Sequence, residues 1–206
     1  MRTWRITQKK VFIFHFTHVD NFPAILNEGL WADASIDCDK YKNIGNVEIK
    51  NRRKTMSVPF GGYVANYVPF YFAPRSPMMY TQFKNDIIKN DETIYLVANA
   101  HDLIPKYKWC CSNMNAAKND TSFFETVEDL EKELSWEIFS TQYWNNTDAY
   151  PDRMERRMAE FLVYERVAWD DFLGVAVYNE AAKVKVYDMM CESQRKDVIV
   201  KNDWYF

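Results

Sequence analysis

The chain has 206 residues, of which 48% are hydrophobic and 17% aromatic, so it can bury a core as a single domain and is not a disordered segment. Its formal charge of −3 argues against a general nucleic-acid binder, although residues 1–90 hold 13 Lys and Arg against 7 Asp and Glu and could form a local basic groove. Only 5 glycines occur, without a GxGxxG or GxxxxGK[ST] run, which argues against a Gly-rich phosphate loop.

The first third of the chain predicts a strand, a helix and a long polar segment. Val11–Phe16 is short, apolar and aromatic, which is typical of a buried strand. His18–Gly29 follows as a predicted helix, with Asp20 as N-cap and the glycine as its stop. Residues 31–57 are polar and end in a basic run at 50–54, so we expect an irregular segment with a functional role.

The remainder predicts mixed strands and helices in one continuous domain, 1–206, since no linker or repeat interrupts it. The expected strands are Val64–Ala73, Thr93–Asn99, Leu173–Tyr178 and Asp197–Tyr205, and the expected helical segments are Val127–Phe139 and a short turn at Glu180–Lys183. An apolar, β-prone run also begins at Glu160, after an arginine-rich loop or turn. Because no regular βαβ alternation is present, these elements predict an α+β fold.

Few residues of the chain are suited to metal or thiol chemistry. The four cysteines have no CxxC spacing, and three histidines are too few for a metal site, so we expect reduced thiols and no metal; the cysteines are Cys38, Cys110, Cys111 and Cys191. The N-terminus does not resemble a signal peptide, and no apolar run approaches the ~20 residues of a membrane span. These features predict a cytoplasmic protein that does not bind a membrane.

Glu160 is a carboxylate at the entry of an apolar run, where its environment could shift its pKa. On residue chemistry alone, a surface ion pair with Arg156 or Arg157 is the better interpretation. His15 and His18, where a strand meets a helix, are on the same grounds best interpreted as core or capping histidines.

Several blocks in order along the chain together resemble the DarT family, the DNA-targeting ADP-ribosyltransferase toxins of bacterial toxin–antitoxin operons. The blocks are Phe16–Asn21 with Ile25, Gly29 and Leu30, then Ile49–Arg53, Tyr67–Met78, Trp144-Asn145 before Pro151–Arg153, Ala159–Val163 and Asp203–Phe206. The resemblance implies an ADP-ribosyltransferase fold with a split antiparallel β core, NAD as donor, and single-stranded DNA as acceptor. It also implies a base, thymine in preference to guanine, as the modified group, and a macrodomain antitoxin as partner; nothing in the sequence demands more than a monomer.

The resemblance also assigns roles to residues. Glu160 matches the catalytic glutamate, and one arginine of the Arg52-Arg53 doublet matches a phosphate-facing catalytic arginine; we prefer Arg53. The residues expected to bind NAD are His15, Thr17, His18, Asn21, Tyr71 and Arg53. Those expected to contact DNA are Arg75, Asn115, Arg153, Arg156 and Arg157.

Two alternatives remain open from the sequence. One is the same fold acting on RNA or protein, or as an NAD glycohydrolase; the other is a non-catalytic DNA-binding module on a decayed transferase scaffold. Because a cleft residue should contribute little to stability, we expect Glu160→Ala to abolish modification while leaving the fold intact.

Overall fold

The computed structural model of the chain describes residues 10–37 and 40–206, and within these ranges eight strands form one sheet. Its order is β10-β9-β4-β1-β3-β7-β5-β6, and all neighbours are antiparallel except the parallel pair β9 and β10. These strands are β1 (Phe12–His18), β3 (Tyr67–Tyr71), β4 (Thr93–Asn99), β5 (Trp109–Ser112), β6 (Phe123–Phe124), β7 (Glu160–Tyr164), β9 (Gly174–Val177) and β10 (Asp197–Val200). A short ribbon, β2 (Leu30–Trp31) with β8 (Arg166–Val167), lies apart from the sheet.

The sheet is split at its centre, between β1 and β3. β1 pairs with β4 along all seven of its residues, and β3 pairs with β7 along all five, but β1 and β3 are in register only at Phe14 opposite Tyr71. Pro69 lies in β3, and because proline has no N–H it cannot donate to a ladder. The two halves of the sheet therefore diverge, and side chains of both line the gap.

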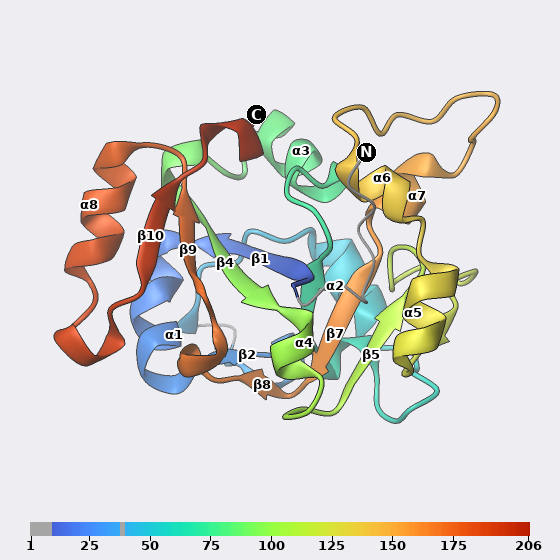
Figure 1. Cartoon of the computed structure of the whole chain (residues 1–206), viewed down its shortest axis with the longest axis horizontal. Helices are drawn as coiled ribbons and strands as arrows, with labels where there is room; N and C mark the ends of the chain where they lie inside the picture. The colour runs from blue at the N-terminus through green and yellow to red at the C-terminus, as the bar shows by residue number, and fades with distance from the viewer. Residues whose placement is uncertain (1–9, 38–39) are drawn as a thin grey trace.

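Helices cover the sheet and its ends (Figure 1). α8 (Glu180–Asp188) packs along β10 and β9 at one edge, and α5 (Val127–Glu133), α6 (Trp136–Ser140) and α7 (Arg153–Arg157) lie at the side of β7 and β5. The other helices are α1 (Phe22–Glu28), α2 (Val47–Arg53), α3 (Pro77–Lys84) and α4 (Ala100–Leu103). No helix in the described ranges is long and apolar enough to cross a membrane.

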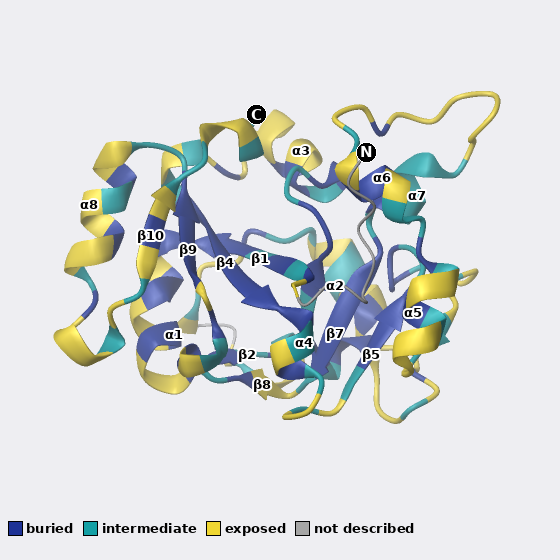
Figure 2. Cartoon of the chain, viewed as in Figure 1, coloured by how far each residue is buried: buried dark blue, intermediate teal, exposed yellow. Residues whose placement is uncertain are grey.

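Strand alternation divides the core between the two faces of the sheet. Ile13 joins a large apolar cluster with α1 and α8, whereas Phe14 and Phe16 join a second, aromatic cluster under α3 and the C-terminal residues. Figure 2 shows the central strands of the sheet buried, and the edge strand β10 and the outer faces of the helices largely exposed. Since the strand cores are rigidly packed on both faces, residues at the split are held in fixed positions.

The predicted α+β class and the main strands are confirmed, but several local predictions are wrong. Helix α1 begins at Phe22, because His18, not Asp20, caps a short 3-10 turn at 19–21. Gly29 does end the helix, with a φ of 81° that favours glycine. The predicted helix 127–139 is interrupted at Leu134, whose extended backbone separates α5 from α6.

Other predicted elements also differ from those of the structure in type or in their bounds. The supposedly irregular segment 31–57 contains α2, with Asn46 as its N-cap, and the arginine-rich segment before Glu160 is helix α7 and not a loop. α8 is longer than the expected turn, and β10 ends at Val200. Cys38 lies outside the described residues; Cys110, Cys111 and Cys191 are free thiols.

Candidate active site

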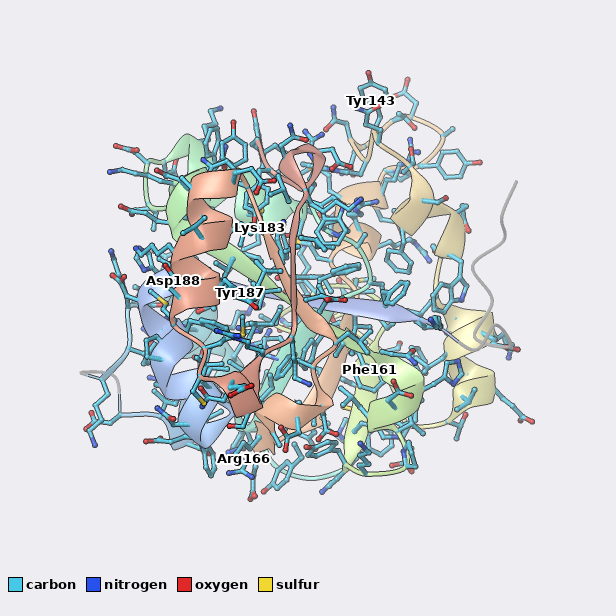
Figure 3. The ribbon with its side chains drawn as sticks, turned by 60° about the vertical axis from the view of Figure 1, so that its left-hand side comes forward. Tyr143, Phe161, Arg166, Lys183, Tyr187 and Asp188 are labelled. Atoms are coloured by element: carbon cyan, nitrogen blue, oxygen red, sulfur yellow. The ribbon has the colours of Figure 1, made fainter. Side chains whose placement is uncertain are left out.

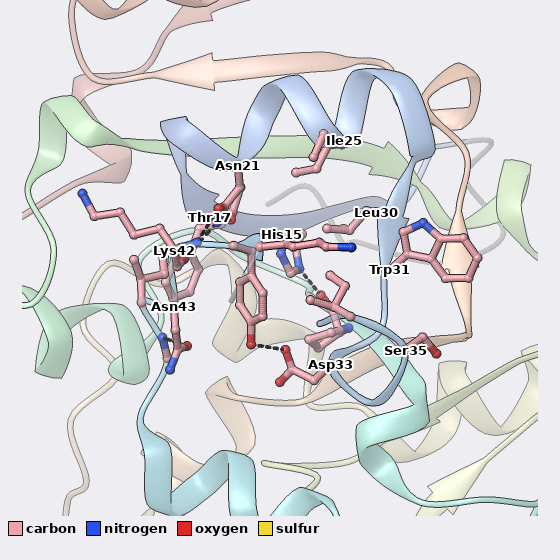
Figure 4. Close-up of a pocket in the computed structure, with 18 of the residues that line it drawn as sticks. His15, Thr17, Asn21, Ile25, Leu30, Trp31, Asp33, Ser35, Lys42 and Asn43 are labelled. Carbon is pink, nitrogen blue, oxygen red and sulfur yellow. Dashed lines mark hydrogen bonds between the residues drawn. The ribbon is translucent and has the colours of Figure 1, made fainter. Parts of the chain in front are cut away.

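The candidate site is a cleft at the split of the sheet, made of two adjoining cavities. The larger has a volume of about 410 Å³ and is lined by β1, α1 and the segment that follows α1; Figure 4 shows its side chains arranged around His15. The smaller, about 70 Å³, is lined by the chemically reactive candidates Arg53, Tyr71, Asn115 and Glu160. Because the two share His15, Pro69 and Met78 among their walls, they form one continuous cleft.

Glu160 lines the smaller cavity and is held there by several hydrogen bonds. It is the first residue of β7, only 1% exposed, and lies opposite Tyr71 in register. Its carboxylate accepts from Arg53 Nη1 at both oxygens (3.0 and 2.8 Å) and from the Ala116 N–H at Oε1 (3.0 Å). Three such contacts hold the carboxylate in one orientation.

Arg53 approaches Glu160 from the last turn of α2 and is 8% exposed. Burial opposes its charge, but the adjoining Glu160 carboxylate outweighs burial and raises the pKa of Arg53. Its Nη2 is buried and has no hydrogen-bond partner within the described residues. A buried guanidinium N–H without a partner is costly, so this donor is suited to an anionic ligand.

The two arginines of the doublet lie in different environments. Arg52 points away from the cleft, and its Nη2 donates to Asn119 on the exposed surface (3.0 Å). Arg53 alone of the two lines the cleft.

Tyr71 provides an apolar wall beside Glu160. It is 8% exposed, stacks on Phe16 with ring centroids 6.2 Å apart, and donates its hydroxyl to Met78 Sδ (3.5 Å). Burial, followed by the Glu160 carboxylate, raises the pKa of Tyr71 above its usual value, so its phenol stays neutral. The ring is placed to contact a planar ligand group in the cleft.

His15 lies across the split, and its Nδ1 contacts the Pro69 carbonyl at 2.8 Å. A carbonyl only accepts, so Nδ1 carries the proton and Nε2 is left as an acceptor when the ring is neutral. Burial lowers the pKa of His15 to about 4. The ring is therefore neutral at physiological pH.

Thr17 and Asn21 line the larger cavity and shape its wall. Asn21 accepts from the Lys42 N–H (2.7 Å), donates to the Lys42 carbonyl (3.0 Å) and donates to Thr17 Oγ1 (3.0 Å). These bonds hold the backbone of Lys42 beside the end of β1. His18 does not line either cavity: it accepts from the Asp20 N–H and its Nε2 contacts Glu92 (3.3 Å), so its contribution to NAD binding stays a prediction.

The residues predicted to contact DNA are in different environments. Asn115 lines the smaller cavity, and its side chain accepts from the Ala117 N–H (2.9 Å). Arg156 pairs with Asp152 (2.7 Å), and Arg153 reaches Thr141 (3.5 Å).

Arg157 is different, because it is 4% exposed and its guanidinium is used inside the fold. It donates to the carbonyls of Ile138, Thr141 and Pro74, and so ties α7 to α6 and to the turn after β3. Arg157 therefore acts as a structural anchor in this arrangement, and its predicted contact with DNA stays a prediction.

Two groups, Lys50 in the cleft and Ser112 buried behind Glu160, were not anticipated from the sequence. Lys50 lines both cavities and donates to Asp33 Oδ1 (2.9 Å) and to the Tyr41 hydroxyl (2.8 Å). It lies three residues before Arg53 on α2, so recognising that helix would have placed both cations on one face. Ser112, by contrast, had no signal in the sequence.

Ser112 positions Glu160. The Glu160 N–H donates to Ser112 Oγ (3.1 Å), and the Ser112 hydroxyl donates to the Met114 carbonyl (2.7 Å), just before the Ala116 N–H that contacts the carboxylate. We expect Ser112→Ala to lower kcat about tenfold with KM for NAD unchanged. The Glu160 N–H and the Met114 carbonyl both lose their hydrogen-bond partner, at a cost of about 1–3 kcal/mol, and the loop that carries Ala116 shifts. Steady-state kinetics test this against Ser122→Ala, an exposed serine of the same loop; equal kcat values for the two variants would refute it.

The neutral His15 ring predicts a pH dependence of stability. Its pKa is about 4 in the folded chain and 6.5 in the unfolded one, so the unfolded chain binds the proton more tightly. The stabilisation is complete above pH 6.5 and declines as the pH falls towards 4. Denaturant unfolding should show a steeper loss over this range than in His15→Gln; parallel curves, or a ring that titrates near 6.5 by NMR, would contradict this.

No group of three or more His, Cys, Asp or Glu side chains in the described ranges could hold a metal ion. The cleft thus presents a fixed carboxylate, a cation with a free donor, an aromatic wall and a neutral imidazole. Such a set is suited to stabilising positive charge beside a bound anionic ligand.

Comparison with known proteins agrees with this description. The chain is 30% identical over 203 residues to a DNA ADP-ribosyl transferase of Thermus sp. (strain 2.9), covering 94% of this chain and 95% of that one. The solved structure of Thermus sp. 2.9 DarT in complex with ADP-ribosylated ssDNA matches with a TM-score of 0.88 over 100% of this chain and 99% of that one, at 30% identity. The same Thermus protein in complex with NAD+ matches with a TM-score of 0.81 over 96% of this chain and 98% of that one, at 29% identity.

A more distant relative is a fusion protein that also carries a glycohydrolase. A DNA ADP-ribosyl transferase-DNA ADP-ribosyl glycohydrolase fusion protein of Thermosipho africanus is 24% identical over 73% of this chain, which spans 38% of the fusion. The family model of DarT, ssDNA thymidine ADP-ribosyltransferase, matches residues 14–206. The chain therefore belongs to the DarT family of ssDNA thymidine ADP-ribosyltransferases, NAD-dependent enzymes of the glycosyltransferase type.

Proposed function

We propose that Glu160 and Arg53 carry the transfer of ADP-ribose from NAD to a thymine base of single-stranded DNA. The observation that supports this is the buried Arg53–Glu160 pair with a free guanidinium donor. It lies beside a cavity of about 410 Å³, which is within the size range of small-molecule sites. Arg53 Nη2 donates to the pyrophosphate, and Tyr71 packs against nicotinamide. The residues of the larger cavity that hold the rest of NAD are His15, Thr17 and Asn21.

The chemistry follows from the charge that develops on the ribose. The bond between ribose and nicotinamide breaks, nicotinamide leaves as a neutral molecule, and positive charge appears on the ribose as in glycoside hydrolysis. Glu160, fixed by Arg53 and Ala116, stabilises that charge and takes the proton that the base nitrogen loses as the new bond forms. Because the Tyr71 phenol is neutral, it adds no negative charge next to Glu160, and Glu160 is the group that faces the positive charge on the ribose.

The acceptor is a single strand because the reacting base must leave its stack to enter the cleft, which costs a few kcal/mol in a duplex. Asn115, at the wall of the cavity next to Glu160, contacts the incoming base. Arg153, Arg156 and Arg75 contact the strand outside the cleft. We also propose a single catalytic domain, 1–206, that acts as a monomer, because the cleft is enclosed by elements of this one sheet and its flanking helices.

In the cell, the protein acts as a cytoplasmic toxin whose mark is removed by a macrodomain glycohydrolase antitoxin. The Thermosipho fusion, which joins a transferase to a DNA ADP-ribosyl glycohydrolase, supports this pairing. Expression of the wild-type chain alone should therefore arrest growth, whereas the glycohydrolase supplied in trans should restore it.

The base is tested directly with a set of oligonucleotides of the same length. The protein is incubated with NAD and strands that contain thymine or guanine, but not both, and the products are weighed by mass spectrometry. A gain of one ADP-ribose on the thymine strands alone is the expected result. Modification of the guanine strands would show that thymine is not the specific acceptor base. Modification of RNA or protein in preference to both strands would show that single-stranded DNA is not the acceptor.

A further inference from the structure

The outer face of α3 carries an exposed row of aromatic side chains close to the cleft. Tyr80 is 42% exposed and Phe83 36% exposed, and they lie three residues apart on the helix, so they share one face. The Phe206 ring lies between them, with ring centroids 5.1 Å from Tyr80 and 6.2 Å from Phe83. Trp144, whose ring centroid is 6.2 Å from that of Tyr80, is itself buried and packs Tyr80 against the loop before α7.

The opposite face of α3 belongs to the active site. Met78 lines both cavities and contacts the Tyr71 hydroxyl, and Gln82 donates to the Ile44 carbonyl in the wall of the cleft (2.7 Å). One helix thus separates the cleft from the aromatic row. Figure 1 shows α3 beside the C-terminal residues, with the loop before α7 rising from the same edge of the molecule.

A cation accompanies this row. The Arg75 guanidinium lies 4.6 Å from the centroid of the Phe206 ring, and its Nε is buried with no partner in the described part of the chain. Arg75 has a φ of 56°, a left-handed conformation that is uncommon for a residue with a side chain. Helix α3 itself ends in Lys84 and contains no acidic residue.

Exposed aromatic faces beside cations match single-stranded nucleic acid, since every base has a face that stacks and each linkage carries a negative charge. Resting on the proposed function, we propose that Tyr80, Phe83 and Phe206 form a stacking track for nucleotides of the DNA substrate that flank the modified base, with Arg75 on a phosphate between them. The track stacks on bases of any sequence, and so it increases the affinity for longer strands.

The test is the affinity of the intact protein for fluorescent single strands of about four and about twelve nucleotides, measured by anisotropy without NAD. The wild type should bind the longer strand more tightly. Tyr80→Ala with Phe83→Ala should weaken binding of the longer strand tenfold or more, reducing it to the affinity of the short one, because one stacked base contributes about tenfold or more. In turnover, the same double variant should raise KM for the long acceptor with kcat unchanged.

Two controls separate stacking from general damage. Tyr80→Phe keeps the ring and should keep the affinity. Tyr187→Ala removes a tyrosine of nearly the same exposure (41%) on α8, which Figure 3 shows beside Asp188 on another part of the surface, and should change nothing. An unchanged affinity for NAD and an unchanged melting temperature verify that each variant is folded.

The outcomes distinguish this track from the proposed function. If the double variant binds the long strand as the wild type does, the track is wrong while thymine modification stands. If it instead loses self-association in sedimentation, with DNA binding intact, the face is a contact between copies of the chain and the track is again wrong. If the wild type binds neither strand and forms no adduct, both the track and the DNA acceptor fail.

Discussion

Glu160→Gln is expected to lower kcat for transfer to DNA by on the order of 10²–10³-fold. The amide keeps the shape of the side chain but carries no charge to stabilise the ribose and cannot take a proton from the base. Nicotinamide release and adduct formation should fall together. Both are measured in one reaction by chromatography.

The same substitution is also expected to destabilise the protein. Glu160 is 1% exposed, and its loss leaves the buried Arg53 charge without a partner, which costs about 3–5 kcal/mol. In a chain of this size that lowers Tm by roughly 6–20 °C. The sequence-based expectation that Glu160→Ala leaves the fold intact is therefore replaced by a loss of stability.

Two further variants separate chemistry from stability. Glu160→Asp keeps a charge opposite Arg53 and should keep most of the stability, but it withdraws the carboxylate from the ribose and should remain nearly inactive. Arg53→Met combined with Glu160→Gln removes both charges and should recover stability without recovering activity. If the double variant regained transfer activity, the assignment of Glu160 would be wrong.

Arg53→Lys is expected to raise KM for NAD by about 10- to 100-fold, the effect of a lost hydrogen bond to a charged group. Lysine keeps a positive charge beside Glu160 but has a single nitrogen, so it cannot hold the carboxylate and also place a donor where Arg53 Nη2 lies. The stability should change little, in contrast to Arg53→Ala, which leaves a buried carboxylate unpaired and should cost about 3–5 kcal/mol.

Arg52→Lys is the matched control for this prediction, because Arg52 is the exposed neighbour that contacts Asn119. Titration calorimetry with NAD and steady-state kinetics compare the two. Equal KM values for the Arg52 and Arg53 variants would show that neither guanidinium binds the pyrophosphate.

The sequence placed Glu160 at the start of a strand correctly, since a carboxylate before Phe161 and Leu162 marks the entry of an apolar run. It did not identify its partner. Local spacing favoured Arg156 or Arg157, whereas the structure pairs Glu160 with Arg53, which is 107 residues away. Such a contact depends on the register of β3 with β7 and on the position of α2, neither of which is encoded in a local pattern.

Helix α2 was missed for a related reason. The charged run 50–54 has no apolar periodicity, so it predicted an irregular segment, and the capping signal at Asn46 was not recognised. The Ala116 N–H that donates to Glu160 belongs to the backbone, and the Ser112 hydroxyl that accepts from the Glu160 N–H lies on a strand that was not predicted. Groups of this kind become visible only when the chain is folded.

The central claim is that the Arg53–Glu160 cleft couples release of nicotinamide to modification of single-stranded DNA. It is tested by incubating the protein with NAD and a thymine-containing strand, and by quantifying nicotinamide, free ADP-ribose and modified DNA in the same sample. We predict one modified strand for each nicotinamide released by the wild type, and almost none of either product with Glu160→Gln. Nicotinamide released with free ADP-ribose and unmodified DNA, or full transfer by Glu160→Gln, would contradict the claim.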